Sequence, residues 1–485
     1  MFQEVLYQFV TTVSGYLWNY LIIFLLVLIG FWFTFRMKFM QIRHIPEMVR
    51  LLGEGVGVKT EGNHISSFQA FCVSAASRVG VGNIAGIAIA VVLGGPGAVF
   101  WMWFIAVIGA ATGYVESTLG QVYKVPAPLH GFHGGPAYYI KYGLRSPWLG
   151  AFFAVLISIT YGLIYNSVQA NTIAASLGTF SINPLYSGIV FAILSGIVIF
   201  GGVARIARVS EKIVPIMAIV YILTAVYVVL VNINLLPNVF YHIFTDAFSF
   251  NSAAGGLFGA TIMNGIKRGL FSNEAGEGSV PNAAATADVS HPAKQGLIQA
   301  LGVFVDTMFI CTASAFIVLF TGNYASTGLN GIALVQYDLG LQLGSWAPPI
   351  MAFFIMTFAF SSIVGNYYYG EININHLTRK KVYLHIFRLF VVLMVFLGSI
   401  ATLDLVWALA DLFMGFLVLT NITSIVRLGK VARIVLEDYF KQKKAGIKEP
   451  VFTKDILPDQ HGIAWWTEKD VAKYRTMKDQ EANWG

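Results

Sequence analysis

The feature that most constrains this chain is a succession of apolar segments, each long enough to cross a lipid bilayer as a helix. Only 11% of the residues are charged, whereas soluble proteins carry roughly 25%. The sequence therefore predicts an all-α polytopic membrane protein with eleven transmembrane helices in residues 1–430, followed by a cytoplasmic tail over 431–485. The expected spans are residues 15–35, 67–91, 96–122, 149–177, 184–201, 213–232, 254–290 (interrupted), 296–320, 346–369, 385–403 and 405–427.

The basic residues predict how these helices are oriented. All but three of the 31 lysines and arginines fall in alternate loops or in the tail, and the opposite set of loops has none. Because positive residues gather on the cytoplasmic side, we expect the N-terminus outside and the C-terminus in the cytoplasm. The net charge of +7 is thus a topology signal. The sequence contains no basic stripe interleaved with aromatic residues, so it does not predict nucleic-acid binding. The two cysteines, Cys72 and Cys311, lie in apolar segments and predict no disulfide framework.

The segment 67–91 is apolar but interrupted at its centre. Arg78 stands there, followed by Gly80, Gly82 and Asn83. A charge at the centre of a membrane helix costs about 2.5–3.5 kcal/mol, and irregular backbone at that depth is found only where it is buried in protein or lines a cavity. A glycine-interrupted hydrophobic segment is typical of the discontinuous helices of transporters, so the pattern indicates solute transport.

The segment 254–290 carries a second interruption. Its polar centre, residues 271–279, contains two acids and two glycines close together. A surface loop is the alternative interpretation, but the topology requires the chain to cross the membrane here. The interrupted segments are the second and seventh of eleven, which predicts a 5+5 inverted repeat over 67–232 and 254–427, preceded by one extra helix over 15–35.

Two broken helices that meet near the bilayer midplane form a binding site from backbone groups. The N-terminal end of a half-helix carries partial positive charge and suits a carboxylate. The freed carbonyl groups and the C-terminal ends suit Na⁺ or an ammonium group. An amino acid zwitterion matches both sets, and it is expected to be small because glycines bring the backbone close to the ligand.

Seven motifs make the chain similar to a known family. They are VGVGNIAG (79–86), GGPGAVFWMW (94–103), GGPAYY (134–139), GLFSNEAGEGS (269–279), HPAKQG (291–296), VDTMFICTASA (305–315) and FSSIVGNYYYGE (360–371). With these motifs the chain resembles the alanine or glycine:cation symporter family, the sodium:alanine symporters, over nearly its whole length. The resemblance implies a LeuT-like inverted-repeat fold.

The resemblance also implies a substrate site at the two breaks. The backbone N–H groups of Val81 and Gly82 would meet the substrate carboxylate, while Asn83 would hold a substrate oxygen or cap the break. Gln169 would reach the substrate, with helix-to-helix hydrogen bonding as the alternative, and Phe271 would limit the size of the solute. The expected substrate-binding residues are Gly80, Val81, Gly82, Asn83, Gln169, Phe271, Ser272, Asn273 and Gly276.

A sodium site follows from the same resemblance. The carbonyl oxygens of Ala76 and Val79 would bind Na⁺, completed by Ser361, Ser362 and the carbonyl of Phe358. Hydroxyl and carbonyl oxygens are hard ligands that suit a small cation. Without the resemblance, two serines in a membrane helix would be interpreted as helix-packing residues. No cofactor other than Na⁺ as the coupling ion is expected.

Ionisable residues inside the expected spans are candidates for a functional role. Arg78 cannot lose its proton, so it needs a carboxylate or carbonyl partner. We expect it to lock its helix through an ion pair, with an effect on the ion site or solute preference as the alternative. Asp404 and Asp411 flank the start of the last span, where they can face solvent or cap the helix. The acids that could serve as the partner of Arg78 are Glu116, Glu274, Glu277 and Asp306.

Together these features predict a secondary active transporter that takes up a small neutral amino acid, alanine or glycine, with Na⁺ by alternating access. A proton-coupled or glutamine-preferring carrier is one alternative, and a non-transporting amino acid sensor on the same fold is another. No HExxH motif occurs and no enzyme activity is expected. The resemblance implies the plasma (inner) membrane of a bacterium or archaeon, and the oligomeric state stays open.

Overall fold

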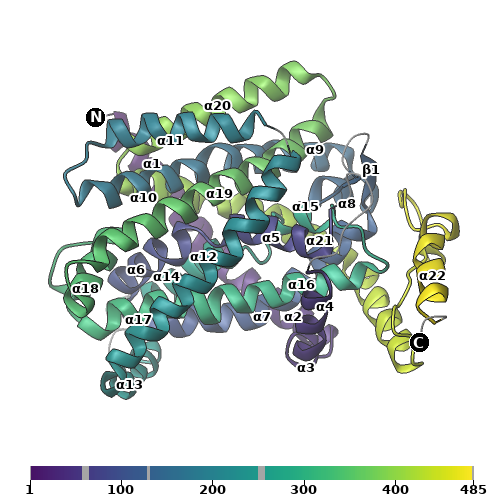
Figure 1. Ribbon diagram of the computed structural model, residues 1–485, viewed down its shortest axis with the longest axis horizontal. Helices are drawn as coiled ribbons and strands as arrows, with labels where there is room; N and C mark the ends of the chain where they lie inside the picture. Colours follow the sequence, from purple (N-terminus) through teal and green to yellow (C-terminus); the bar gives the residue numbers. More distant parts are fainter. Residues whose placement is uncertain (1, 57–64, 128–130, 202, 250–256, 483–485) are drawn as a thin grey trace.

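The computed structural model describes residues 2–56, 65–127, 131–201, 203–249 and 257–482. Apart from one isolated bridge and one small hairpin, the regular structure of these residues is helical (Figure 1). In the hairpin, β1 (Val125–Ala127) pairs antiparallel with β2 (Gly131–His133). Helices satisfy their own backbone hydrogen bonds, which is the arrangement that a bilayer requires of a spanning segment.

Seven helices in the described part of the chain are long and apolar enough to cross a membrane. Three of these spans contain a stretch of π-helix, a local widening that is frequent at functional sites. The seven spans consist of α1 (Phe2–Leu17), η1 (Trp18–Ile22) and α2 (Ile23–Arg36); α7 (Gly97–Val122); α9 (Pro147–Ile159), η3 (Thr160–Tyr165) and α10 (Asn166–Gly178); α16 (Pro292–Phe304), η6 (Val305–Cys311) and α17 (Thr312–Thr321); α19 (Ala347–Leu377); α20 (Lys381–Ile400); and α21 (Leu403–Lys444).

Two further spans result if each strongly bent helix pair is taken as one. The first joins α5 (Ser67–Arg78) to η2 (Val81–Asn83) and α6 (Ala85–Gly94) through a bend of 58°. The second joins the end of α12 (Val203–Val231) to η4 (Ile233–Leu235) and α13 (Leu236–Ala247) through a bend of 73°. The first bend lies at the interruption that the sequence predicts.

Two of the eleven expected segments do not meet the same criterion of length and hydropathy. α11 (Pro184–Ile199) is a short apolar helix of 16 residues. The segment 254–290 is divided into α14 (Leu257–Asn273) and α15 (Val280–Ala284). The structure therefore supports between seven and nine spans, and the number eleven stays a prediction.

The ends of the molecule carry shorter elements. α8 (Pro136–Tyr142) and α22 (Glu468–Ala482) lie toward one end of the long axis, whereas α3 (Met40–Arg43) and α4 (Ile45–Glu54) lie closer to the middle (Figure 1). α13 and α18 (Gly331–Leu343) lie toward the other end. The remaining short elements are η7 (Asn323–Ala325) and η8 (Lys454–Ile456).

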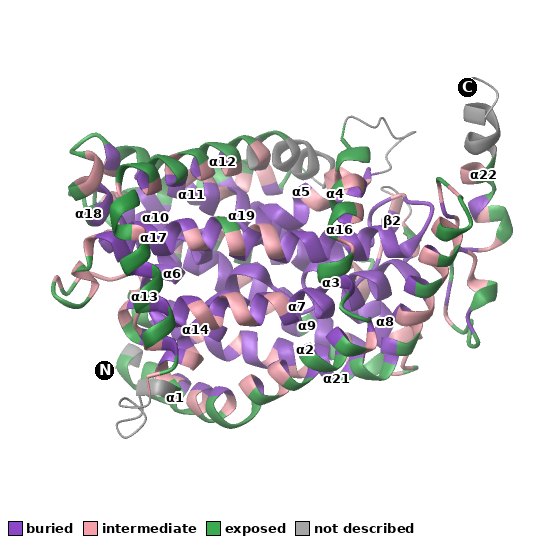
Figure 2. Cartoon of the chain, turned by 90° about the horizontal axis from the view of Figure 1, so that it is seen from below, coloured by how far each residue is buried: buried purple, intermediate pink, exposed green. Residues whose placement is uncertain are grey.

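The broken helix α5–α6 is enclosed by other helices. α5 packs against α12 and α19, while α6 packs against α7, α14 and α18. The interior is buried and the outer faces of the bundle are exposed (Figure 2). Large apolar side chains such as Ile193, Leu223 and Leu389 point outward from α11, α12 and α20, as expected for surfaces that contact lipid.

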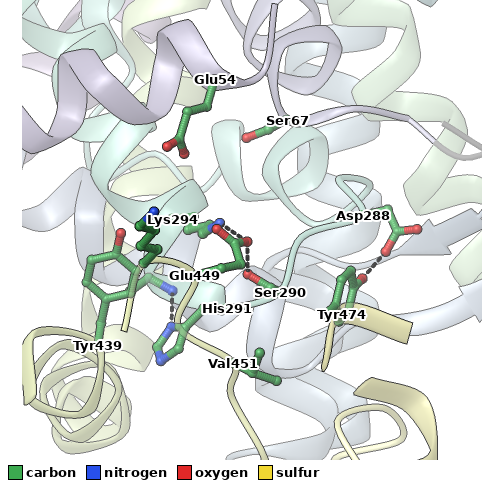
Figure 3. A network of polar contacts seen from close by, with 12 residues as sticks. Glu54, Ser67, Asp288, Ser290, His291, Lys294, Tyr439, Glu449, Val451 and Tyr474 are labelled. Carbon is green, nitrogen blue, oxygen red and sulfur yellow. Dashed lines mark hydrogen bonds and ion pairs between the residues drawn. The ribbon is translucent and has the colours of Figure 1, made fainter. Parts of the chain in front are cut away.

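The C-terminal segment, residues 445–475, folds back onto the loop between α15 and α16 (Figure 3). The Ser290 hydroxyl donates to Glu449 Oε1 at 2.6 Å, and the Lys294 ammonium pairs with the same carboxylate. Lys473 pairs with Asp288 at 2.6 Å. These charge-assisted contacts hold the segment against the protein.

The same segment covers a buried lysine just beyond the end of α7. Lys124 Nζ donates to the Ala287 carbonyl oxygen at 3.0 Å. It lies 3.9 Å from the ring centroid of Phe132 and 4.5 Å from that of Trp466. The Trp466 indole donates to the Gln121 carbonyl oxygen at 3.0 Å. Lys124 is therefore shielded from solvent by a residue of the C-terminal segment.

Candidate functional site

The first break begins where α5 ends at Arg78. α5 starts with a capping box, in which Ser66 and Gln69 bind each other's backbone N–H groups. After Arg78 the chain turns through Gly80, whose N–H donates to Asn83 Oδ1 at 2.9 Å. Asn83 therefore caps the short helix η2, as one of its two expected roles requires.

The side chain of Gln169 lies against this break. Gln169 Oε1 accepts a hydrogen bond from the Val81 N–H at 3.2 Å. A Cβ atom on Gly80 would overlap Ser362 Oγ and would lie 3.0 Å from Gln169 Oε1. Glycine is thus required at position 80 by close contacts on two sides, and the break brings together α5, α10 and α19.

The second break separates α14 from α15. Glu274, Gly276 and Gly278 adopt positive φ angles of 58°, 100° and 78°. Two glycines accept this conformation readily, whereas Glu274 needs support from neighbouring groups to hold it. The polar centre of the segment therefore forms a turn inside the protein.

The carboxylate of Glu274 connects the two breaks. Glu274 Oε1 accepts from the Ser77 hydroxyl at 2.7 Å, and Oε2 accepts from the Ser279 hydroxyl at 2.6 Å. Ser77 belongs to the last turn of α5, whereas Ser279 directly precedes α15. All three side chains are buried, so the contact joins the broken helices in the interior.

Glu116, on α7, stabilises the second break from its other side. Its two carboxylate oxygens accept from the N–H groups of Gly276 and Gly278, each at 3.2 Å. Asn421 Nδ2 donates to Glu116 Oε2 at 2.8 Å and to the Gly276 carbonyl oxygen at 2.9 Å. Gly276 thus faces α7 and α21, and no contact with the first break is recorded for it among the described residues.

A second buried carboxylate, Asp306, lies between the breaks on the π-helix η6. Asn83 Nδ2 donates to its Oδ1 at 2.5 Å, and the Ser272 hydroxyl donates to its Oδ2 at 2.6 Å. Asn273 Nδ2 contacts the neighbouring Thr307 hydroxyl at 3.1 Å. Polar groups of both broken helices therefore converge on η6.

Aromatic rings cover the first break. A Cβ atom on Gly82 would lie only 2.7 Å from Phe271 Cδ1, so the ring sits directly against the glycine. The ring of Phe271 in turn contacts Tyr165 and Trp407, with centroids 4.7 Å and 4.9 Å apart. Phe271 thus lies directly against the first break, and its role in limiting the size of the solute stays a prediction.

Two of the residues expected to bind sodium lie in direct contact. The Ser362 hydroxyl donates to the Ala76 carbonyl oxygen at 2.9 Å. The Ser361 hydroxyl donates to the carbonyl oxygen of Phe358 in its own helix at 2.8 Å. Val79 is buried at the start of the break. The structure therefore joins one of the expected oxygen atoms of α5 to one of α19, and the sodium site itself stays a prediction.

The partner of Arg78 differs from the expected acid. Arg78 Nη2 donates to Gln299 Oε1, and Nη1 approaches the Gln299 carbonyl oxygen at 3.4 Å. Gln299 Oε1 also accepts from the Ser74 hydroxyl at 2.8 Å. Among the described residues, no ion pair joins Arg78 to Glu116, Glu274, Glu277 or Asp306. The expected ion-pair lock is therefore replaced by hydrogen bonds to a glutamine of α16.

The expectation that Asp411 faces solvent or caps its helix is wrong. Asp411 is buried in α21, and its Oδ2 pairs with Arg268 Nη2 at 2.8 Å and with Lys267 Nζ at 3.4 Å. The Trp18 indole donates to the Asp411 carbonyl oxygen at 2.9 Å. The sequence did contain a signal for such a partner, because Lys267 and Arg268 lie inside an apolar segment and two buried cations need an acid.

Several site residues were not found by sequence reasoning. Tyr161, Tyr165 and Trp407 form, together with Phe271, a continuous group of aromatic rings beside the breaks, and Gln299 binds Arg78. Single aromatic and amide residues in membrane helices are ordinary packing residues, so their types alone gave no signal. Only the folded chain shows which of them face a break.

A multi-helix membrane protein with two interrupted helices, joined by buried polar groups and covered by aromatic rings, belongs to the class of membrane transporters. Comparison of the sequence gives the family. Residues 3–454 match the model of the sodium:alanine symporter family, and the chain belongs to this family. It is thus a transporter and not an enzyme.

Three relatives illustrate the range within this family. The chain is 51% identical over 470 residues to a probable sodium/glutamine symporter, GlnT, of Bacillus subtilis, covering 97% of this chain and 98% of the relative. It is 50% identical to the amino-acid carrier protein AlsT of the same organism, covering 95% and 97%. It is 37% identical to the sodium/alanine symporter AgcS of Methanococcus maripaludis, covering 87% and 94%.

Among solved structures, the chain is similar to Mhp1, a nucleobase-cation-symport-1 family transporter. The sequence identity is 14% and the TM-score is 0.43, with 79% of this chain and 81% of Mhp1 covered. A likeness of this size does not define the fold.

Proposed function

We propose that this protein is a secondary active transporter that carries a small neutral amino acid into the cell together with Na⁺ by alternating access. The observation that carries the proposal is the meeting of two helix breaks in the buried interior, where Glu274 binds Ser77 and where Asp306 binds both Asn83 and Ser272. Broken helices at this place in a transporter supply both charged ends of an amino acid with backbone partners.

The substrate carboxylate is assigned to the N–H groups of Val81 and Gly82. In the present arrangement the Val81 N–H donates to Gln169 Oε1, so a bound carboxylate would take over this donor and meet the Gln169 side chain. The partial positive charge of the adjoining helix end favours the anion. Phe271, Ser272 and Asn273 form the opposite wall, and Gly276 supports the turn behind it.

The sodium site is assigned to the carbonyl oxygens of Ala76, Val79 and Phe358 and to the hydroxyls of Ser361 and Ser362. Support comes from the 2.9 Å contact between Ser362 Oγ and the Ala76 carbonyl oxygen, which already pairs a ligand of α5 with one of α19. A cation between these helices would favour one relative position of the two. Because the substrate binds the same broken helix, each ligand would favour the binding of the other.

The wider framework is also part of the proposal. It has eleven spans with a LeuT-like 5+5 inverted repeat over 67–232 and 254–427, after one extra helix over 15–35. The N-terminus would lie outside and the C-terminal segment in the cytoplasm, in the plasma membrane of a bacterium or archaeon. In support, all but three of the 31 lysines and arginines fall in alternate loops or in the tail.

The solute has two candidates. The family resemblance indicates alanine or glycine. Glutamine is favoured by the 51% identity to a probable sodium/glutamine symporter, which exceeds the 37% identity to a sodium/alanine symporter. Both kinds of solute present the same carboxylate and ammonium groups to the helix breaks, so the choice depends on the surroundings of the side chain.

Uptake into proteoliposomes tests the proposed function. Labelled alanine and labelled glutamine are supplied with an inward Na⁺ gradient, or with choline in place of Na⁺ at fixed pH. Accumulation above equilibrium only with the Na⁺ gradient is the expected result. Accumulation driven by a pH gradient in choline would instead identify a proton-coupled carrier. Binding without accumulation would identify a sensor.

Replacement of Ser362 by alanine should weaken sodium binding. The change removes a hydroxyl that contacts the Ala76 carbonyl oxygen, and the loss of one cation ligand worth about 1.4 kcal/mol raises the half-saturating Na⁺ concentration about tenfold. Ser424→Ala is the matched control, because this buried hydroxyl donates at 2.8 Å to a carbonyl of its own helix. An unchanged Na⁺ dependence in Ser362→Ala, measured by initial uptake rates, would remove Ser362 from the sodium site.

A further inference from the structure

Glu277 is a buried acid in the second break whose hydrogen bonding is one-sided. Its Oε2 accepts from the Tyr161 hydroxyl at 2.7 Å and from the Tyr165 hydroxyl at 3.2 Å. Its Oε1 is buried and has no hydrogen-bond partner among the described residues. No ion pair with a described lysine, arginine or histidine involves Glu277. The structure thus holds one carboxylate oxygen in place and leaves the second without a donor.

Such an arrangement calls for an explanation, because buried polar atoms in native proteins almost always have partners. The side chain of Glu277 is fully buried, so bulk water does not supply a donor. Glu116 and Glu274, the other two acids around this break, accept on both of their oxygens. Glu277 therefore differs from its neighbours in having capacity for one further donor.

The position of Glu277 relative to the first break follows from two side chains. Tyr165, which donates to Glu277, lies one helical turn before Gln169, whose Oε1 contacts the Val81 N–H. The ring of Tyr165 also packs on Phe271, which itself lies against Gly82. The backbone groups assigned to the substrate carboxylate are thus connected to Glu277 through one layer of aromatic side chains.

We propose that Glu277 Oε1 accepts a hydrogen bond from the side chain of the transported amino acid and thereby selects a carboxamide side chain, as in glutamine, over alanine and glycine. The inference rests on the proposed function and names its substrate class. A solute whose carboxylate lies at Val81 and Gly82 would direct its side chain past Tyr165 and Phe271. The N–H₂ group of a carboxamide offers the missing donor at the end of a side chain longer than a methyl group.

A neutral donor fits this position better than a cationic one. Both tyrosine hydroxyls already donate to Oε2. One further hydrogen-bond donor at Oε1 would therefore give both oxygens of the carboxylate a partner. A lysine or ornithine side chain would have to give up the strong hydration of its ammonium group to enter this fully buried place, a cost that attraction to the carboxylate need not repay. Preferred uptake of a cationic amino acid would therefore overturn the inference.

The two tyrosines act as positioning residues for this contact. By holding Oε2 they fix the rotation of the carboxylate, so that Oε1 points away from them. A site built to hydrogen-bond one group of its substrate discriminates strongly against analogues that lack it, because its own polar atom is then left unpaired. Alanine and glycine are such analogues.

The test compares the ratio of kcat/KM for glutamine to that for alanine in the full-length protein and in Glu277→Gln. Initial rates are measured in proteoliposomes with an inward Na⁺ gradient, and ornithine is included as a competitor. The wild-type protein should prefer glutamine. Glu277→Gln, which keeps the shape but replaces the carboxylate, should lower the ratio by about tenfold or more. Glu437→Gln is the control, because Glu437 lies half exposed on α21 and should leave the ratio unchanged.

A binding measurement covers the case in which Glu277→Gln transports poorly. Thermal stabilisation of the purified variant by glutamine and by alanine is recorded in Na⁺ buffer. Loss of the glutamine effect with retention of the alanine effect supports the inference. If both solutes accumulate and the variant leaves their ratio unchanged, the role of Glu277 is overturned while the proposed function stands. If neither solute accumulates in the wild-type protein, the proposed function itself fails.

Discussion

Gly80→Ala is expected to reduce solute accumulation by about 100-fold or more. A Cβ atom at this position would overlap Ser362 Oγ and would lie 3.0 Å from Gln169 Oε1. Relief of the overlap moves the Ser362 hydroxyl away from the Ala76 carbonyl oxygen, and the proposed sodium and substrate groups are displaced together. A misplacement of about 1 Å in such a site is enough for a loss of this size.

Initial uptake rates in proteoliposomes measure this effect, with protein amount and monodispersity as the check on folding. Gly259→Ala is the matched control. Gly259 lies on α14, and a Cβ atom there would meet nothing within 4 Å, so its uptake should equal that of the wild type. Wild-type uptake by Gly80→Ala would show that the first break tolerates a side chain and does not hold both ligands.

Asp411→Asn is expected to destabilise the folded protein by about 3–5 kcal/mol, because it leaves buried positive charges without their partner. Asp411 is the acid that pairs with both Arg268 and Lys267. These cations lie on α14, shortly before the second break, whereas Asp411 lies on α21. The substitution therefore weakens the attachment of one broken helix to the last span.

Thermal unfolding of the purified protein measures this loss, and the expected result is a clear fall in Tm. Asp404→Asn is the control, since Asp404 is exposed near the start of the same helix. Its replacement should change the free energy of unfolding by no more than about 0.5 kcal/mol and leave Tm nearly unchanged. A Tm of Asp411→Asn equal to that of the wild type would mean that the two cations find other partners.

The two breaks were predictable because they depend on local chemistry. Gly80, Gly82 and Asn83 interrupt an apolar run, and Glu274 to Gly278 interrupt another, so the sequence itself shows where a helix cannot continue. The structure places a bend of 58° at the first and three positive φ angles at the second. The assignment of roles to the individual site residues stays a proposal.

The partners of the buried charges were not predictable in the same way. Arg78 binds Gln299, and Asp411 lies 144 residues from Lys267 along the chain. Such pairs are set by which helices become neighbours, and helix packing is not encoded in any short pattern. The π-helical stretches of η3 and η6 also carry no recognisable sequence signature, although they hold Tyr165 and Asp306 beside the breaks.

Because Lys124 is buried under the C-terminal segment, docking of that segment is coupled to proton binding by this lysine. Burial lowers the pKa of Lys124 to about 7 from 10.5, with Asp288 raising it and Lys473 lowering it further. An exposed lysine binds a proton throughout the neutral range, so docking of the segment expels one. The free energy of docking therefore becomes more favourable as pH rises from about 7 toward 10.5, and this group changes it little below 7.

Hydrogen exchange of the Phe452 amide, which donates to the Ser290 carbonyl oxygen, measures docking once it is corrected for the intrinsic exchange rate. Protection should be greater at pH 8.5 than at pH 7, and Trp466→Ala should remove the difference. Equal protection at both pH values in the wild-type protein would separate docking from Lys124. Through this one lysine, the attachment of the C-terminal segment to the helix bundle is expected to depend on pH.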